Sequence, residues 1–134
     1  MKLLVAPSLP PILADALALL LAPEGIEVVH HSRRFPTDTS DQHWILTLSA
    51  EDAGWVVLTA DPALIASPAG RLCWRQSGLI GLVLSPAYRN LRPAEIASRL
   101  LALWPRLKDW AAGAKGGQAA IVPSARIVRS LKIL

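Results

Sequence analysis

The first thirty residues carry the pattern of a strand, a helix and a second strand, which is the unit from which parallel sheets are built. Residues 2–5 form a short apolar run that is followed by Ala6. Residues 11–21 place apolar side chains on one helical face, between prolines and a glycine that are typical of helix ends. Residues 26–30 are rich in β-branched side chains. Because a helical crossover of this length joins parallel strands, the pattern predicts an α/β fold.

The same alternation continues along the chain and predicts a three-layer α/β domain, in which helices flank a mostly parallel central sheet. Residues 55–58 form a continuous apolar run, as expected for a strand that is covered on both faces. Pro105 lies inside the pattern of the longest helix and is expected to kink it. The other expected elements are a loop over 31–39, a helix from Ser40 to about Asp52, a short helix from Pro62, a helix over 69–77, a strand over 79–84, the long helix from Pro93, a turn over 113–118, and strand-like runs at 120–122 and 126–134.

Length and composition narrow the class of protein further. With 134 residues, we expect one α/β domain over residues 1–112 and a C-terminal extension over 113–134 that packs on it. The chain is 52% hydrophobic and 18% charged, which excludes a disordered protein. No stretch approaches the roughly 18 apolar residues of a membrane span, so we expect a soluble, cytoplasmic protein without a membrane partner. Cys73 is the single cysteine, which excludes an internal disulfide and a thiolate-rich metal site.

Charge is distributed unevenly along the chain. Residues 1–61 hold three basic and eight acidic side chains, whereas residues 62–134 hold eleven basic and two acidic ones. Such polarity suits a partner that carries phosphates and is also held through a cation, because basic side chains neutralise phosphates while carboxylates bind metal. A plain solvated surface explains the same charges equally well.

Two aspartates lie at the ends of predicted elements. Asp61 directly follows the strand over 55–58, where the topology would aim a side chain into the crevice above the strand ends. Asp41 lies in the first turn of the helix that follows Ser40. Taken alone, each is better explained by helix capping or by the helix dipole. Taken together, the two carboxylates could hold one Mg²⁺ or Mn²⁺ ion that polarises a phosphodiester, so we predict both as metal ligands and catalytic residues.

Four further residues are predicted to bind the substrate at the same edge of the sheet. Arg89 and Asn90 follow the strand over 79–84 and are candidates for phosphate contacts, while Ser8 and Thr59 follow or end the two central strands. The three histidines do not form a zinc pattern, because the adjacent pair of His30 and His31 points to opposite faces. There is no glycine-rich phosphate loop and no nucleophile elbow. The tryptophans are expected to pack in the core.

Several short motifs follow one another along nearly the whole chain. They are Leu9-Pro10-Pro11, Ser40-Asp41-Gln42-His43-Trp44-Ile45, Val56-Val57-Leu58-Thr59-Ala60-Asp61, the segment from Pro86 to Leu91, and Trp104-Pro105. Their order and spacing resemble the PIN-like domains of VapC-type toxins. The resemblance implies a PIN-like fold, magnesium-dependent cleavage of RNA by acidic residues, and a toxin that is neutralised by a cognate antitoxin. Asp41 and Asp61 match two acidic positions of the family.

The chain departs from the family pattern at two positions. The family has an acid at the end of the first strand, where this chain has Ala6, and often a second acid where this chain has Ala63. Each loss removes a ligand and one negative charge, which weakens cation binding. Two functions therefore stay open: a metal-dependent ribonuclease of toxin-antitoxin type with impaired activity, or an inactive PIN-like module that binds RNA or protein. Relatives often pair with themselves, so a homodimer is also possible.

A third hypothesis is a receiver-like signalling domain, in which Asp61 would be the phosphoacceptor at the end of the third strand. That chemistry needs an acidic pair after the first strand to hold Mg²⁺. Ala6 and Pro7 occupy that place in this chain, which argues against a receiver.

Overall fold

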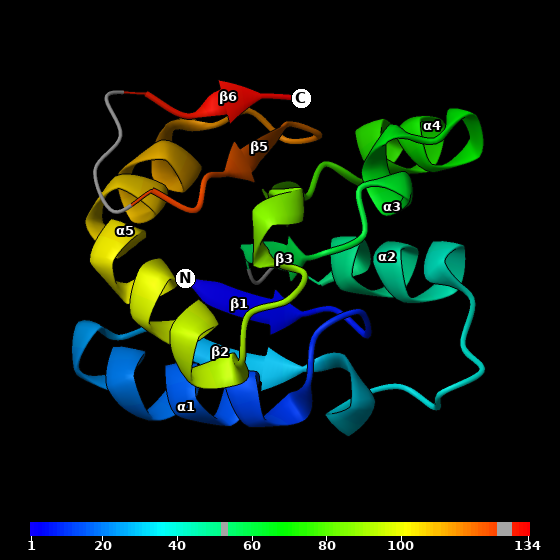
Figure 1. The fold of residues 1–134 in the computed structure, drawn as a ribbon. Coiled ribbons are helices and arrows are strands. Elements are labelled where there is room, and N and C mark those ends of the chain that lie inside the picture. Colours follow the sequence, from blue (N-terminus) through cyan, green and yellow to red (C-terminus); the bar gives the residue numbers. More distant parts are fainter. Residues whose placement is uncertain (52–53, 126–129) are drawn as a thin grey trace.

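The computed structural model describes residues 1–51, 54–125 and 130–134, and its centre is a six-stranded sheet with the strand order β2-β1-β3-β4-β5-β6 (Figure 1). The first five strands in this order pair in parallel, and only β6 at the edge runs antiparallel to its neighbour. The mostly parallel sheet predicted from the sequence is therefore confirmed. The strands are β1 (Lys2–Val5), β2 (Glu27–His30), β3 (Trp55–Thr59), β4 (Ile80–Leu84), β5 (Ala119–Val122) and β6 (Lys132–Ile133).

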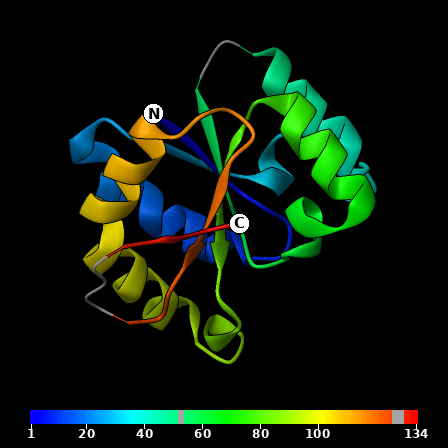
Figure 2. The same ribbon diagram turned by 90° about the horizontal axis from the view of Figure 1, so that it is seen from above.

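Helices cover both faces of the sheet. Seen along the sheet, α1 and α5 lie on one side and α2, α3 and α4 on the other, which confirms the three-layer α/β architecture (Figure 2). The α-helices are α1 (Pro11–Leu21), α2 (Asp41–Ala50), α3 (Ala63–Ala66), α4 (Pro68–Ser77) and α5 (Pro93–Gly113), and three short 3-10 helices are η1 (Ala22–Glu24), η2 (His31–Arg33) and η3 (Pro86–Tyr88).

Each face of the sheet has its own hydrophobic core, because side chains alternate between the two faces along a strand. In β1, Leu3 and Val5 pack in the core beneath α1 and α5. Leu4, and Ala6 just beyond the strand, pack in the opposite core together with Trp44 of α2. Because Ala6 is two residues after Leu4, its side chain lies on the same face of the sheet as Leu4, the face covered by α2, α3 and α4.

The structure corrects several expected boundaries. Residues 31–39 are not all loop, since η2 forms directly after β2. The second helix ends at Ala50, and Asp52 lies outside the described residues, as do residues 126–129 of the last strand-like run. The long helix expected from Pro93 is α5, and Pro105 lies inside it, as the sequence predicted. The short helix expected at Pro62 begins one residue later, at Ala63, with Pro62 as its N-cap.

The C-terminal part joins the same sheet. The expected boundary after residue 112 falls in the last turn of α5, and β5 then pairs with β4.

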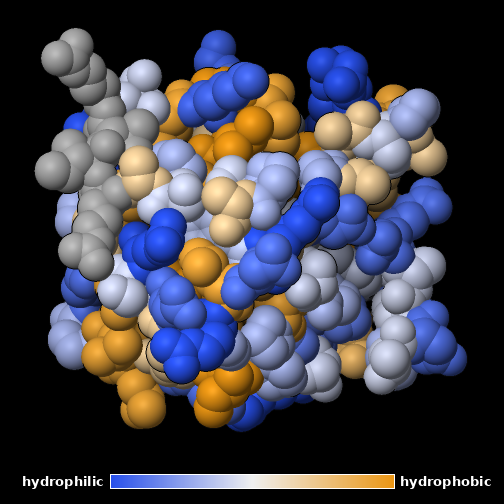
Figure 3. Space-filling model, viewed as in Figure 1, coloured by the Kyte–Doolittle hydropathy of each residue, from blue (hydrophilic) through white to orange (hydrophobic). Residues whose placement is uncertain are grey.

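Among the described residues, no helix is both long and apolar enough to cross a membrane. Apolar side chains of α1 reach the surface, and Figure 3 shows apolar surface at the lower left, where α1 lies. Ile12, Leu19 and Leu20 are 61%, 79% and 56% exposed.

Candidate functional site

The strand order changes direction between β1 and β3. From β1 the chain crosses to β2 on one side, and later it returns to β3 on the other side of β1. The loop after β1 leads to α1 on one face of the sheet, and the loop after β3 leads to α3 on the opposite face. In open α/β sheets, ligands bind at the carboxyl ends of strands at such a point. Ser8 and Asp61 lie on these two loops, as the sequence predicted.

Hydrogen bonds join the two loops through Ser8 and Thr59. The backbone N–H of Ala60 donates to Ser8 Oγ at 3.0 Å, and the N–H of Asp61 donates to Thr59 Oγ1 at 3.0 Å. The two hydroxyl oxygens lie 3.1 Å apart and share a hydrogen bond. The side chains of Ser8 and Thr59 thus use their oxygens to satisfy the first two backbone donors after β3, and they fix the loop after β1 against it.

Thr59 is 0% exposed, so the predicted role in substrate binding needs a correction. A fully buried hydroxyl does not touch a ligand, and Thr59 can act only by orienting Ser8. Ser8 itself is exposed. The loop is further anchored by His30, whose Nδ1 accepts from the N–H of Ser32 at 3.0 Å. The proton therefore lies on Nε2, which donates to the carbonyl of Leu9 at 2.7 Å.

A pocket of about 230 Å³ opens beside Ser8 on the α1 and α5 side of the sheet edge. Its polar lining includes Ser8, Ser85 and Arg89, and its apolar walls include Leu9 and Leu91. We call it the Ser8 pocket. Arg89 therefore shares a pocket with Ser8, whereas Asn90 is exposed and does not belong to the lining residues.

The wall of the Ser8 pocket is held by Tyr88 of η3. Its hydroxyl donates to the carbonyl of Pro123 at 2.7 Å, which ties the turn after β4 to the segment after β5. Burial raises the pKa of Tyr88 to about 12, although the nearby cation of Arg99 acts in the opposite direction. The phenol therefore stays a protonated donor across the physiological range.

Both predicted metal ligands are hydrogen-bonded within their own helix region. Asp41 Oδ1 accepts from Trp44 Nε1 at 3.1 Å, and Asp61 Oδ1 accepts from the N–H of Ala63 at 3.0 Å, in the first turn of α3. The carboxylate of Asp61 thus satisfies the N–H of Ala63, the first residue of α3, although the N-cap residue itself is Pro62. At the start of α2, Ser40 is the N-cap, since its Oγ accepts from the N–H of His43 at 3.2 Å.

Asp41 lies in the first turn of α2, and Asp61 lies just before α3. Asp41 borders a hollow of about 440 Å³ between α2 and α4, whose lining also includes Ala63, Leu72 and Cys73. Asp61 is exposed but is not among the lining residues of that hollow.

Ala6, at the position where the sequence indicates that a first-strand acid is missing, is part of the core. Ala6 is 2% exposed and packs with Leu4 and Trp44, while its N–H donates to the carbonyl of Leu58 at 2.9 Å. Over the described residues, no group of three or more His, Cys, Asp or Glu side chains could hold a metal ion. Mg²⁺ takes octahedral oxygen ligands, so Asp41 and Asp61 could supply only a minority of them, and water and a substrate phosphate would have to supply the rest.

Sequence reasoning missed the aromatic cluster around His31. The ring centroid of His31 lies 5.1 Å from that of Phe35 and 5.3 Å from that of Trp44, and the residue is 3% exposed. Among the described residues, its Nε2 has no hydrogen-bond partner. Burial and the charge of His30 lower the pKa of His31, and the carboxylate of Asp41 opposes them. The only sequence signal was an adjacent histidine pair followed by a phenylalanine.

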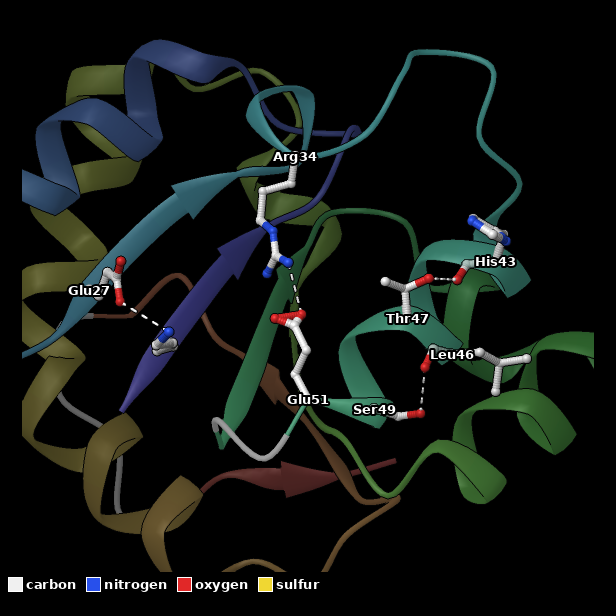
Figure 4. Close-up of polar contacts among 8 residues, drawn as sticks. Glu27, Arg34, His43, Leu46, Thr47, Ser49 and Glu51 are labelled. Atoms are coloured by element: carbon white, nitrogen blue, oxygen red, sulfur yellow. Dashed lines mark hydrogen bonds and ion pairs between the residues drawn. The ribbon is translucent and has the colours of Figure 1, made fainter.

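The segment after η2 is clamped to the end of α2 by Arg34 (Figure 4). Its guanidinium donates to Glu51 Oε2 at 2.8 Å and lies over the ring of Trp55, 5.2 Å from the centroid. The hydrogen bond from Arg34 lowers the pKa of Glu51. On the same face, Lys2 pairs with Glu27 at 3.5 Å. Arg34 and Lys2 are therefore neutralised by acidic side chains of the same chain and hold neighbouring elements together.

The family to which this chain is similar agrees with its α/β fold, in which the strand order changes direction between β1 and β3. The family model described as PIN like domain matches residues 1–86, which include the first four strands and both aspartates. The chain belongs to the PIN-like domain family. Searches among curated proteins and among solved structures gave no match.

Proposed function

We propose that this PIN-like domain binds RNA without cleaving it in a metal-dependent way. The observation that carries the proposal is the burial of Ala6 in an apolar core at the place of the first-strand acid. The hydrogen bonds of Asp41 with Trp44 of α2 and of Asp61 with the first residue of α3 give further support. Membership in the PIN-like family makes a nuclease-related function possible, and the altered carboxylate set favours binding over catalysis.

The distribution of unpaired cations supports a phosphate-bearing partner. The three basic residues of the N-terminal half all form ion pairs, with Glu27, Asp15 and Glu51. By contrast, several exposed cations of the C-terminal half have no ion-pair partner within the described residues. They are Arg71, Arg75, Arg89, Lys115 and Lys132. Exposed, unneutralised arginine and lysine side chains are the groups that bind a nucleic-acid backbone by releasing its counterions.

The test is binding of a fluorescent single-stranded oligoribonucleotide, followed by anisotropy in buffer with EDTA. We expect binding that weakens with salt, with a slope of log K against log salt of about −0.7 for each phosphate neutralised. Asp41→Asn and Asp61→Asn should bind at least as tightly as the parent, because each removes a negative charge near the RNA. Binding that requires Mg²⁺, and that either variant abolishes, would contradict the proposal.

A metal-dependent endoribonuclease is the second candidate, and the exposure of both Asp41 and Asp61 favours it. In that case Mg²⁺ or Mn²⁺ would be weakly bound, with the RNA phosphate as a further ligand. This candidate predicts cleavage products that appear only with the metal and disappear in Asp61→Asn.

A protein partner is proposed from the exposed apolar residues of α1. Ile12, Leu19 and Leu20 would be covered by a cognate antitoxin, as expected for a toxin-antitoxin system, or by a second copy of the chain. Light scattering on the purified protein separates these possibilities. A dimer whose mass falls to that of one chain in Leu19→Asp indicates self-association, whereas a monomeric parent leaves the antitoxin as the proposed partner.

A further inference from the structure

The hydrogen bonds of Thr59 determine whether the Ser8 hydroxyl can donate to a ligand or accept from it. Thr59 is fully buried, and its Oγ1 already accepts from the N–H of Asp61. Its own proton needs an acceptor, because a buried hydroxyl without one is costly. Ser8 Oγ, at 3.1 Å, is that acceptor. In the hydrogen bond between the two hydroxyls, Thr59 is therefore the donor and Ser8 the acceptor.

As a result, the Ser8 hydroxyl can only donate a hydrogen bond to a ligand and cannot accept one. A hydroxyl oxygen has two lone pairs and one proton. One lone pair of Ser8 receives the N–H of Ala60 and the other the O–H of Thr59. The remaining proton is free for a ligand in the Ser8 pocket, while no lone pair is left for a metal ion or for a ligand N–H.

Two more side chains of the Ser8 pocket, Ser85 and Arg89, can also donate hydrogen bonds to a ligand. Ser85 lies at the N-cap position of η3, but among the described residues its side chain makes no capping hydrogen bond, so its hydroxyl is available to a ligand. The guanidinium of Arg89 has no ion-pair partner within the described residues. In the part of the chain that the structure describes, no Asp or Glu lines the pocket. The pocket therefore presents donors and a positive charge to a ligand that must bring acceptors.

We propose that the Ser8 pocket binds a single phosphate group, with Ser8, Ser85 and Arg89 as its donors. The inference rests on the proposed RNA binding for the source of the phosphate, which is a backbone phosphate of the RNA strand. A phosphate presents acceptor oxygens on every side, and an arginine pairs with it through two parallel N–H groups. Thr59 is a positioning residue, since it sets the direction of the Ser8 proton without reaching the ligand.

The first experiment measures oligoribonucleotide binding to Arg89→Gln by anisotropy between 50 and 200 mM NaCl. We expect about tenfold weaker binding, and a salt slope that is smaller by about 0.7 because one phosphate contact is lost. The matched control is Arg33→Gln, an exposed arginine that pairs with Asp15 and is not one of the unpaired cations proposed to bind RNA. It removes the same charge outside the Ser8 pocket and should leave the slope nearly unchanged. Equal effects of the two variants would overturn the inference.

The second experiment tests the role of Thr59 with Thr59→Ser and Thr59→Val. Serine keeps the donor to Ser8 and should retain the parental affinity. Valine is similar in shape but removes the donor, so Ser8 is no longer held in one direction, and we expect about threefold to tenfold weaker binding with an unchanged salt slope. Thermal unfolding of both variants checks that the domain is folded under the binding conditions. A slope that falls with valine, or an affinity that does not change, contradicts the positioning role.

The third experiment identifies the source of the phosphate by amide NMR titration with inorganic phosphate, adenosine monophosphate and the oligoribonucleotide. Shifts at Ser8, Ser85 and Arg89 with all three, strongest for the oligonucleotide, support the phosphate pocket on RNA. Shifts with the two small ligands, when the oligonucleotide does not bind, support the pocket but overturn the proposed RNA binding. An oligonucleotide that binds without shifting these amides overturns the pocket and leaves the proposed function intact.

Discussion

Replacing Ala6 with aspartate tests whether the end of β1 is a metal-binding position or a core position. Ala6 is 2% exposed among apolar side chains, so the buried carboxyl should stay protonated at pH 7. Relative to an unfolded aspartate of pKa about 3.9, this costs about 4 kcal/mol at pH 7, at about 1.4 kcal/mol per pH unit. At pH 5 the same contribution is only about 1.5 kcal/mol. The variant should therefore regain about 2.5 kcal/mol between pH 7 and pH 5.

The assay is urea unfolding, followed by tryptophan fluorescence at pH 5, 6 and 7. Ala6→Asn is the matched control, since it buries a polar group of the same size without a charge. Its cost of about 1–3 kcal/mol should not change with pH. The reasoning is refuted if Ala6→Asp is as stable as Ala6→Asn at pH 7. It is also refuted if Mn²⁺ stabilises the aspartate variant selectively, because the crevice would then still be a metal site.

Two further predictions concern the core on the α2 to α4 side. A Cβ added to Gly81 would lie 2.7 Å from Ile65 Cδ1, so Gly81→Ala should cost about 1–3 kcal/mol in urea unfolding, and an unchanged midpoint would contradict this packing. His31 has a lowered pKa in the folded state, so its contribution to stability is intact above its unfolded pKa of about 6.5. That contribution is lost as the pH falls through the folded pKa, because the unfolded chain takes up the proton first. His31→Phe should remove this loss between pH 7 and pH 5, and a pH dependence equal to that of the parent would rule out His31 as its source.

Much of the fold follows from short-range patterns, whereas the site depends on long-range packing. The run from Trp55 to Leu58 is apolar throughout and was recognisable as a strand covered on both faces. Ser8 follows β1, and Thr59 and Asp61 end or follow β3, at the carboxyl edge of the sheet. The sequence did not reveal which face of the sheet Ala6 occupies, because that depends on the side of the sheet on which α2 packs. Nor did it reveal that Thr59 donates to Ser8, because these residues are 51 positions apart in the chain.

The residues around His31 show the same limit. Nothing in the local sequence tells a buried histidine from an exposed one, and the environment of His31 comes from the ring of Trp44 on another element. The ion pair of Arg34 with Glu51 likewise joins segments 17 residues apart. Side chains whose properties are set by such distant neighbours become visible only in the folded chain.

The most direct test of the central claim is incubation of a labelled oligoribonucleotide with the purified protein and Mn²⁺, resolved on a denaturing gel over time. The parent and Asp61→Asn are compared at protein concentrations that saturate binding by anisotropy. We predict that the RNA is bound in both cases and stays intact. Cleavage products that require Mn²⁺, and that are absent with Asp61→Asn, would contradict the account and establish the chain as a metal-dependent nuclease.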